Sequence, residues 1–177
     1  MDRPILFLDV DGPLIPFGPS SARHEVSGPG PDRGEPSPGR GNPLLGRLDP
    51  AVGPSLTALG CDLVWATTWM AEANESVGPL IGLPPLPVVE WPESAEAGPR
   101  GLHWKTPALV ERAGGRPFIW VDDEIGAVDR LWVAAQYEGP SLLHRVDPSK
   151  GLTEDDFSAL ADWLRTVVPA RSPEANG

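Results

Sequence analysis

Cysteine is nearly missing from this chain, since Cys61 is the only one in 177 residues. A disulfide framework and an all-cysteine metal site are therefore excluded, and Cys61 is expected to be a small buried apolar side chain. The sequence also lacks an apolar run long enough to span a bilayer and a hydrophobic segment typical of a secretion signal. We therefore expect a cytoplasmic protein with no membrane partner.

Basic residues are scarce as well, with 14 Lys and Arg against 25 Asp and Glu and a net charge of −11. A chain this acidic does not attract nucleic acid or an anionic membrane through its overall charge. Its length suits one domain with a single sizeable core.

Apolar residues are sparse in residues 18–43, which are rich in Pro, Gly, Ser, Arg and acids. Such composition predicts a flexible insertion, because little apolar surface is available to offset the entropy of ordering it. We expect one domain over residues 1–168 that contains this insertion, followed by a frayed tail at 169–177.

Elsewhere, short apolar segments alternate with segments of helical periodicity. The strands are predicted at residues 5–8, 61–66, 86–90, 118–121 and 141–146. Helices are predicted at 49–59, 106–113, 124–136 and 153–168, and 71–81 is only weakly helical. This alternation favours a three-layer, Rossmann-like α/β sandwich with a parallel sheet covered on both faces.

The first apolar segment ends at Asp9-Val10-Asp11-Gly12, and its two carboxylates share one side of an extended chain. A calcium loop also begins Asp-x-Asp, but its later ligand positions, counted from Asp9, hold Pro13, Leu14 and Ser20. A calcium loop is therefore excluded. The remaining alternatives are a solvated turn and a functional site at the end of a strand.

Two further predicted strands also end in polar residues: Thr67-Thr68 follows one, and Asp122-Asp123 follows another. Lys105 precedes a predicted helix. The carboxyl ends of parallel strands meet at one edge of a sheet, so these groups are expected to share a site with Asp9.

This set, in this order, resembles the haloacid dehalogenase superfamily of aspartate-nucleophile phosphohydrolases. The superfamily motifs are D-x-D-G, a strand-terminal Ser or Thr, a Lys, and an acidic pair closing a later strand. The resemblance implies a parallel five-stranded sheet of order 5-4-1-2-3. It also implies a phosphatase in which Asp9 forms an aspartyl-phosphate and Asp11 serves as acid and then as base.

The resemblance assigns the remaining groups as well. Mg²⁺ would be held by Asp9, by the backbone carbonyl of Asp11, and by the pair Asp122 and Asp123, with Asp123 as the preferred direct ligand. The phosphoryl group would be bound by residues from three segments: Gly12, Thr67, Thr68 and Lys105. Thr67 is preferred over Thr68, and Arg100 and Arg116 are the alternatives to Lys105.

Neither usual cap position contains enough apolar sequence for a domain, so the protein resembles capless members of the superfamily. The runs at 65–69, 120–123 and 142–148 are similar to small bacterial members, some of which are associated with RNA-repair proteins. The substrate is then a phosphomonoester, with a macromolecule such as a nucleic-acid end as one hypothesis. The alternatives are a phosphotransferase and a catalytically silent binding or regulatory module.

Trp69 is expected to pack, with a place at the pocket mouth as the alternative, and none of the three histidines is expected to be catalytic.

Overall fold

A computed structural model of the chain describes residues 3–18, 42–91 and 100–167. The centre of the predicted insertion and the predicted tail lie outside these residues. No helix within the described ranges is long and apolar enough to cross a membrane.

A parallel four-stranded sheet forms the middle layer, in the order β2-β1-β3-β4. Its strands are β1 (Ile5–Leu8), β2 (Asp62–Trp65), β3 (Phe118–Asp122) and β4 (Ser141–Arg145). The two central strands, β1 and β3, are buried at every residue, whereas the outer strands are partly exposed. Continuous apolar runs are typical of parallel strands covered on both faces.

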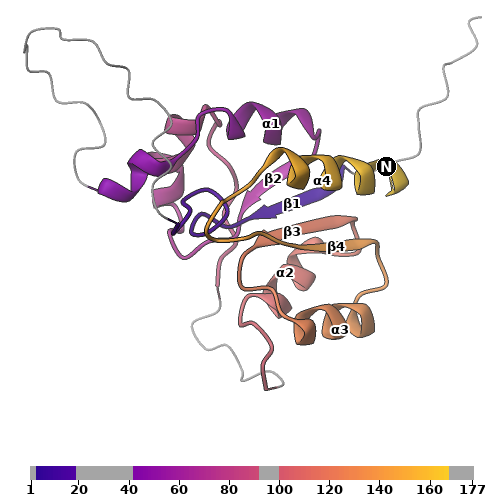
Figure 1. Cartoon of the computed structure of the whole chain (residues 1–177). Coiled ribbons are helices and arrows are strands. Elements are labelled where there is room, and N and C mark those ends of the chain that lie inside the picture. Colours follow the sequence, from indigo (N-terminus) through magenta and orange to yellow (C-terminus); the bar gives the residue numbers. More distant parts are fainter. Residues whose placement is uncertain (1–2, 19–41, 92–99, 168–177) are drawn as a thin grey trace, which may run out of the picture.

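Helices cover both faces of the sheet, with α1 (Val52–Ala58) and α4 (Glu154–Val167) on one side and α2 (Thr106–Ala113) and α3 (Ala127–Gln136) on the other (Figure 1). Alternating strand residues supply two separate cores. Leu6 and Leu8 pack toward α1 and α4, while Ile5 and Phe7 pack toward α2 and α3. The predicted three-layer α/β arrangement is confirmed at this level.

The predicted fifth strand at residues 86–90 is wrong, because this segment forms only a parallel bridge between Val88 and Trp65. Two backbone hydrogen bonds make the bridge: Trp65 donates to Pro87 and Val89 donates to Trp65. Prolines at 84, 85 and 87 remove backbone donors and fix φ, which prevents a longer ladder. In the expected order 5-4-1-2-3, predicted strands 5, 4, 1 and 2 correspond to β4, β3, β1 and β2, which are neighbours in that sequence in the sheet. The bridge at Val88 lies beside β2, where the third predicted strand was expected.

Several element boundaries also differ from the prediction. Helix α1 begins at Val52 rather than near Asp49, whose carboxylate accepts from the Ala51 N–H in the preceding turn. Helix α3 begins at Ala127 instead of 124, because Gly126 is extended and caps the helix together with Asp129. The weakly helical segment 71–81 consists of two short turns, η2 (Ala73–Val77, a π-helical turn) and η3 (Gly78–Ile81, a 3₁₀ turn). A further 3₁₀ turn, η1 (Pro43–Arg47), precedes α1.

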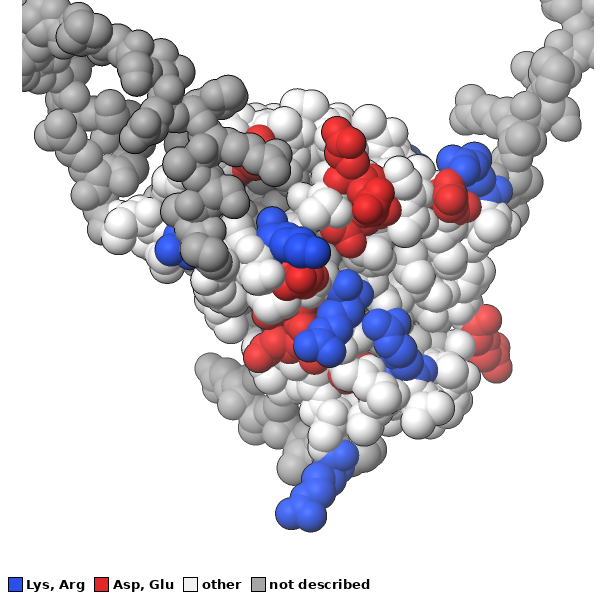
Figure 2. All heavy atoms as spheres, in the orientation of Figure 1, with Lys and Arg blue, Asp and Glu red and all other residues white. Residues whose placement is uncertain are grey.

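Acidic and basic side chains are interspersed over the face of the molecule drawn in Figure 2, and no continuous basic field covers its described part. That face therefore offers no broad basic surface to which a polyanion could bind, in agreement with the low content of Lys and Arg.

Candidate active site

The backbone hydrogen bonds of the sheet continue one residue beyond the ends of β1 and β2 and keep the carboxyl ends of β1, β2 and β3 side by side. Asp9 N–H donates to Val121 O at 3.1 Å, and Ala66 N–H donates to Leu8 O at 2.8 Å. The acids after β1, the threonines after β2 and the acids closing β3 therefore lie at the same carboxyl edge of the sheet.

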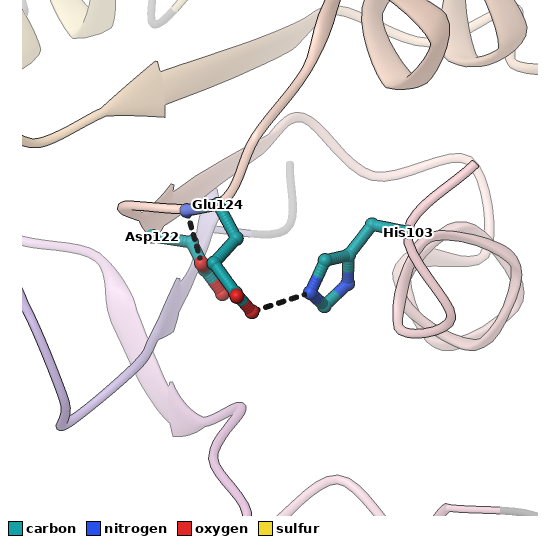
Figure 3. Close-up of side chains that lie close together, drawn as sticks. All are labelled: His103, Asp122 and Glu124. Atoms are coloured by element: carbon teal, nitrogen blue, oxygen red, sulfur yellow. Dashed lines mark hydrogen bonds and ion pairs between the residues drawn. The ribbon is translucent and has the colours of Figure 1, made fainter. Parts of the chain in front are cut away.

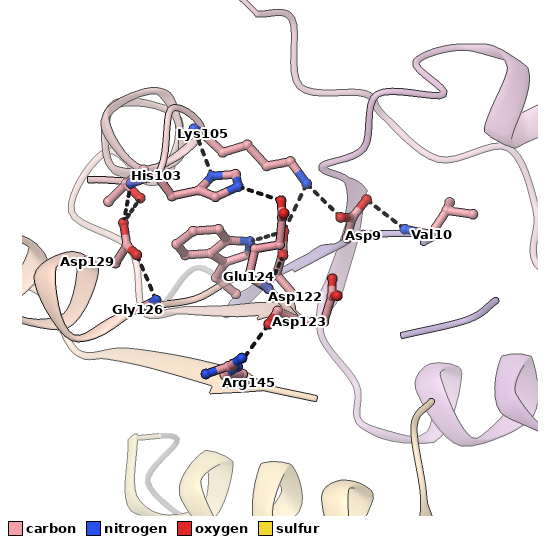
Figure 4. A network of polar contacts seen from close by, with 12 residues as sticks. Asp9, Val10, His103, Lys105, Asp122, Asp123, Glu124, Gly126, Asp129 and Arg145 are labelled. Atoms are coloured by element: carbon pink, nitrogen blue, oxygen red, sulfur yellow. Dashed lines mark hydrogen bonds and ion pairs between the residues drawn. The ribbon is translucent and has the colours of Figure 1, made fainter. Parts of the chain in front are cut away.

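Lys105 joins two of these carboxylates in a buried cluster (Figure 4). Its ammonium Nζ lies 2.7 Å from Asp9 Oδ2 and 2.9 Å from Asp122 Oδ2. Lys105 is 2% exposed and Asp122 is completely buried. A lysine in this environment requires both partners, because an unpaired charge there would lose its hydration without compensation.

The pKa shifts follow from burial and from these contacts. Burial raises the pKa of Asp9 to about 6, against the opposing effect of the Lys105 charge. Burial would lower the pKa of Lys105, but the carboxylates of Asp9 and Asp122 outweigh it, and the pKa lies above its ordinary value. The Lys105 ammonium at 2.7 Å thus favours the ionised form of Asp9 against the effect of burial.

Each carboxylate of the cluster is held from more than one direction. Asp9 Oδ1 accepts from the Val10 N–H at 2.8 Å. Asp122 accepts from the Glu124 N–H at 2.9 Å and from the Trp120 indole N–H at 3.2 Å. These bonds fix the orientation of both side chains.

The chain offers a set of donors that suits a hard cation. Carboxylate oxygens of Asp9, Asp122 and Asp123 lie within 4.8 Å of one another. Burial and the charge of Asp122 raise the pKa of Asp123, and a cation at this place would favour its ionised form. Three convergent carboxylates fit the oxygen ligands that Mg²⁺ prefers.

Gly12 lies against Asp123. A Cβ at Gly12 would be 2.6 Å from Asp123 Cγ, and φ of Gly12 is +82°, which favours glycine. The absence of a side chain therefore lets the D-x-D-G turn approach the acidic strand end.

Asp11 and the threonines complete the predicted set. The Trp69 indole N–H donates to Asp11 Oδ2 at 3.0 Å, and Thr67 Oγ1 accepts from the Trp69 N–H at 3.3 Å. Thr67 is fully buried, whereas Thr68 is exposed. Neither alternative to Lys105 occupies its place: Arg116 pairs with Asp62 at the opposite end of the sheet, and Arg100 is exposed.

Sequence reasoning missed the role of His103, which lies beside this cluster. His103 Nδ1 accepts from the Lys105 N–H at 3.2 Å, so in the neutral ring Nε2 carries the proton and donates to Glu124 Oε2 at 3.0 Å. His103, Asp122 and Glu124 form a second group of potential metal ligands (Figure 3). Both ring nitrogens are engaged by the protein, so we assign His103 to the support of the Lys105 backbone.

Asp129 was missed too. Its buried carboxylate accepts from the His103 N–H at 2.8 Å, the Thr106 hydroxyl at 2.6 Å and the Gly126 N–H at 2.8 Å. It thereby joins the segment that carries Lys105 to the start of α3 (Figure 4). An acid three residues after Gly126 is a capping signal that the sequence contains. The sequence does not reveal that this acid also binds His103 and Thr106.

Comparison with protein-family models, with curated proteins and with solved structures finds no match for this chain. The function is therefore argued from the residues at the edge of the sheet.

Proposed function

We propose that this protein is a Mg²⁺-dependent phosphatase that acts through an aspartyl-phosphate, as its resemblance to the haloacid dehalogenase superfamily implies. The observation that carries the proposal is the buried contact of Lys105 with both Asp9 and Asp122. A nucleophilic carboxylate next to a fixed cation, with a second acid two residues later, suits phosphoryl transfer better than a structural ion pair.

Asp9 is the nucleophile in this proposal. Its ionised carboxylate attacks phosphorus in line, the bond to the leaving oxygen breaks, and Asp11 gives that oxygen a proton. Asp11 then takes a proton from a water molecule, which attacks the phosphorus of the aspartyl-phosphate and releases phosphate. Regenerated Asp9 and Asp11 close the cycle.

Two further side chains stabilise the transferred phosphoryl group, one by its charge and one by a hydrogen bond. Lys105 neutralises negative charge on the phosphoryl oxygens and on Asp9. Thr67 is preferred over Thr68 as a hydrogen-bond donor, because it is buried at the strand end whereas Thr68 is exposed. Mg²⁺, held by Asp9, the Asp11 carbonyl, Asp122 and Asp123, would supply a further positive charge at this place.

The test is a phosphate-release screen with Mg²⁺ over sugar phosphates, nucleotides, phosphopeptides and phosphorylated DNA or RNA ends. We expect turnover that disappears with a chelator and in Asp9→Asn. Asp123→Asn is expected to raise the Mg²⁺ concentration needed for half activity more than Asp122→Asn does, if Asp123 is the direct ligand. Thr68→Val is the control and is expected to retain activity.

Chelator-insensitive turnover, or full turnover in Asp9→Asn, would contradict the proposal. If no phosphomonoester is hydrolysed while phosphorylated ligands still bind, the rival function is favoured: a binding or regulatory module that keeps the fold without turnover. Transfer of the phosphoryl group to an added alcohol instead of water would identify a phosphotransferase.

A further inference from the structure

Trp104 breaks the pattern of the other tryptophans. It is 43% exposed, which is more than any other tryptophan among the described residues. Trp65 and Trp120, by contrast, are almost completely buried in the sheet. A single exposed apolar side chain is common at a protein surface, so exposure alone does not indicate a function. The exposed Trp104 indole, however, comes directly before the proposed catalytic lysine and carries further aromatic contacts.

The Trp104 ring is held in place by two other rings. Trp91 contacts it in a T-shaped geometry with centroids 4.8 Å apart, and His103 stacks on it at 5.6 Å. Both neighbours are anchored to the site, since the Trp91 indole N–H donates to Thr67 O at 3.2 Å and His103 binds the Lys105 N–H. A ring fixed in this way loses little conformational entropy when a ligand binds.

The position of the ring relates it to the phosphoryl site. Lys105 Nζ lies 5.8 Å from the centre of the Trp104 ring and 2.7 Å from Asp9 Oδ2. Trp91 and Trp104, which we call the aromatic wall, thus extend from the backbone of Thr67 to the side chain of Lys105. A phosphoryl group between these two residues would have the aromatic wall beside it.

We propose that the aromatic wall binds a planar ring carried by the substrate, which makes the substrate a phosphomonoester with a nucleobase or a similar heteroaromatic group. This inference rests on the proposed phosphatase function. The base can pack its π-face or its edge against the exposed part of the Trp104 indole, and its sugar separates the ring from the phosphate. The net charge of −11 disfavours a long polyanion, so the ligand is a mononucleotide or a terminal nucleotide rather than an extended nucleic acid.

The test uses two ligands that differ only in the base: adenosine 5′-monophosphate and ribose 5-phosphate. Binding of each to the full-length Asp9→Asn protein with Mg²⁺ is measured by calorimetry, with inorganic phosphate as a third ligand. Stacking on one aromatic side chain predicts that the nucleotide binds about tenfold more tightly than ribose 5-phosphate. In Trp104→Leu the two affinities should fall within about twofold of each other, whereas Trp104→Phe should keep most of the preference.

Leu131→Ala is the matched control, because Leu131 is an exposed apolar residue on α3 at 72% exposure. It should keep the tenfold preference. An oligonucleotide with a terminal phosphate distinguishes the two sources of the base: equal affinity for it and for the mononucleotide indicates a terminal nucleotide, and weaker affinity indicates a free one.

Equal binding of the nucleotide and ribose 5-phosphate, or a preference that survives in Trp104→Leu, would overturn the inference. If phosphate and ribose 5-phosphate bind and the wild-type protein hydrolyses sugar phosphates, the proposed function stands and only the aromatic wall fails. If no phosphorylated ligand binds and none is hydrolysed, both proposals fail.

Discussion

Trp69 lies at a strained turn, and its indole contacts Asp11, the residue proposed as acid and base. Its indole donates to Asp11 Oδ2, and the next residue, Met70, has φ of +51°. A left-handed conformation is costly for a methionine and persists only where its surroundings enforce it. The contacts of Trp69 with Asp11 and Thr67 are among the surroundings that hold this turn.

Removal of this indole donor should affect the protonation of the leaving group in particular. We expect Trp69→Phe to lower kcat/KM about tenfold for an alkyl phosphate, which is the loss expected when a hydrogen bond to a charged group is removed. The loss should be much smaller for p-nitrophenyl phosphate, whose leaving group needs no proton. Steady-state kinetics on both substrates measures the difference. Trp163→Phe on α4 is the control, and equal losses on both substrates would show that Trp69 acts only through packing.

Gly12 allows a close approach that no other residue can. We expect Gly12→Ala to lower the free energy of unfolding and to weaken Mg²⁺ binding, because the new Cβ would meet the Asp123 carboxylate. Gly60→Ala is a matched control: Gly60 has φ of +71° with no atom within 4 Å of its Cβ position. Both variants should pay about 1–2 kcal/mol for the left-handed conformation. Only Gly12→Ala should lose more than this and need more Mg²⁺, and identical behaviour of the two would contradict the contact.

At the scale of elements, Asp129 connects the loop before α2 to the start of α3. Asp129→Ala leaves three donors without their acceptor in a buried place, so we expect a loss of about 3 kcal/mol or more in unfolding free energy. Thr106→Val removes only one of these hydrogen bonds and should cost about 1 kcal/mol. Urea unfolding measures both, and equal stability of the two variants would mean that the carboxylate does not join the elements.

The start of α4 gives a pH-dependent contribution to stability. Asp156 accepts from the N–H and the hydroxyl of Thr153 and contacts His144 Nε2 at 2.8 Å. Burial opposes ionisation, but the hydrogen bonds from Thr153 and His144 outweigh it, and the pKa of Asp156 lies below its ordinary value of 3.8. The stabilisation is therefore fully present above about pH 4 and is lost as the pH falls through the folded-state pKa.

We expect Asp156→Asn to lower the unfolding free energy by about 1 kcal/mol at pH 7, as the loss of a helix cap does. The difference from wild type should shrink as the pH falls below 4. Asp155→Asn removes an exposed acid from the same helical turn and should have a smaller effect. A deficit in Asp156→Asn that does not change with pH would contradict the account.

At the scale of the whole molecule, the sequence predicts the layers because their signals are local. Unbroken apolar runs identified β1 and β3, and helical periodicity with Gly114 after Ala113 identified α2. The segment 86–90 has the apolar residues of a strand, but Pro87 and its neighbours limit it to one bridge. The missing backbone donors of the prolines therefore outweighed the strand-forming tendency of the apolar residues in this segment.

The residues of the candidate site also divide into those with a local sequence signal and those without one. Strand ends predict that Asp9, Thr67 and Asp122 share an edge, because parallel strands end together. The Trp69 contact with Asp11 spans 58 residues and the Asp129 contact with His103 spans 26, so neither has a local signal. Lys105 could be singled out in part because the chain contains only one other lysine, Lys150.

The most direct test of the central claim is detection of a phosphoryl group on Asp9. Asp11→Asn should trap it, because p-nitrophenolate leaves without a proton while hydrolysis of the aspartyl-phosphate still needs a base. The variant is mixed with p-nitrophenyl phosphate and Mg²⁺, quenched in acid and mapped by peptide mass spectrometry. The account predicts phosphorylation at Asp9 that is absent in the Asp9→Asn/Asp11→Asn double variant. Phosphorylation at another residue, or hydrolysis with no phosphorylated protein at any time, would contradict it.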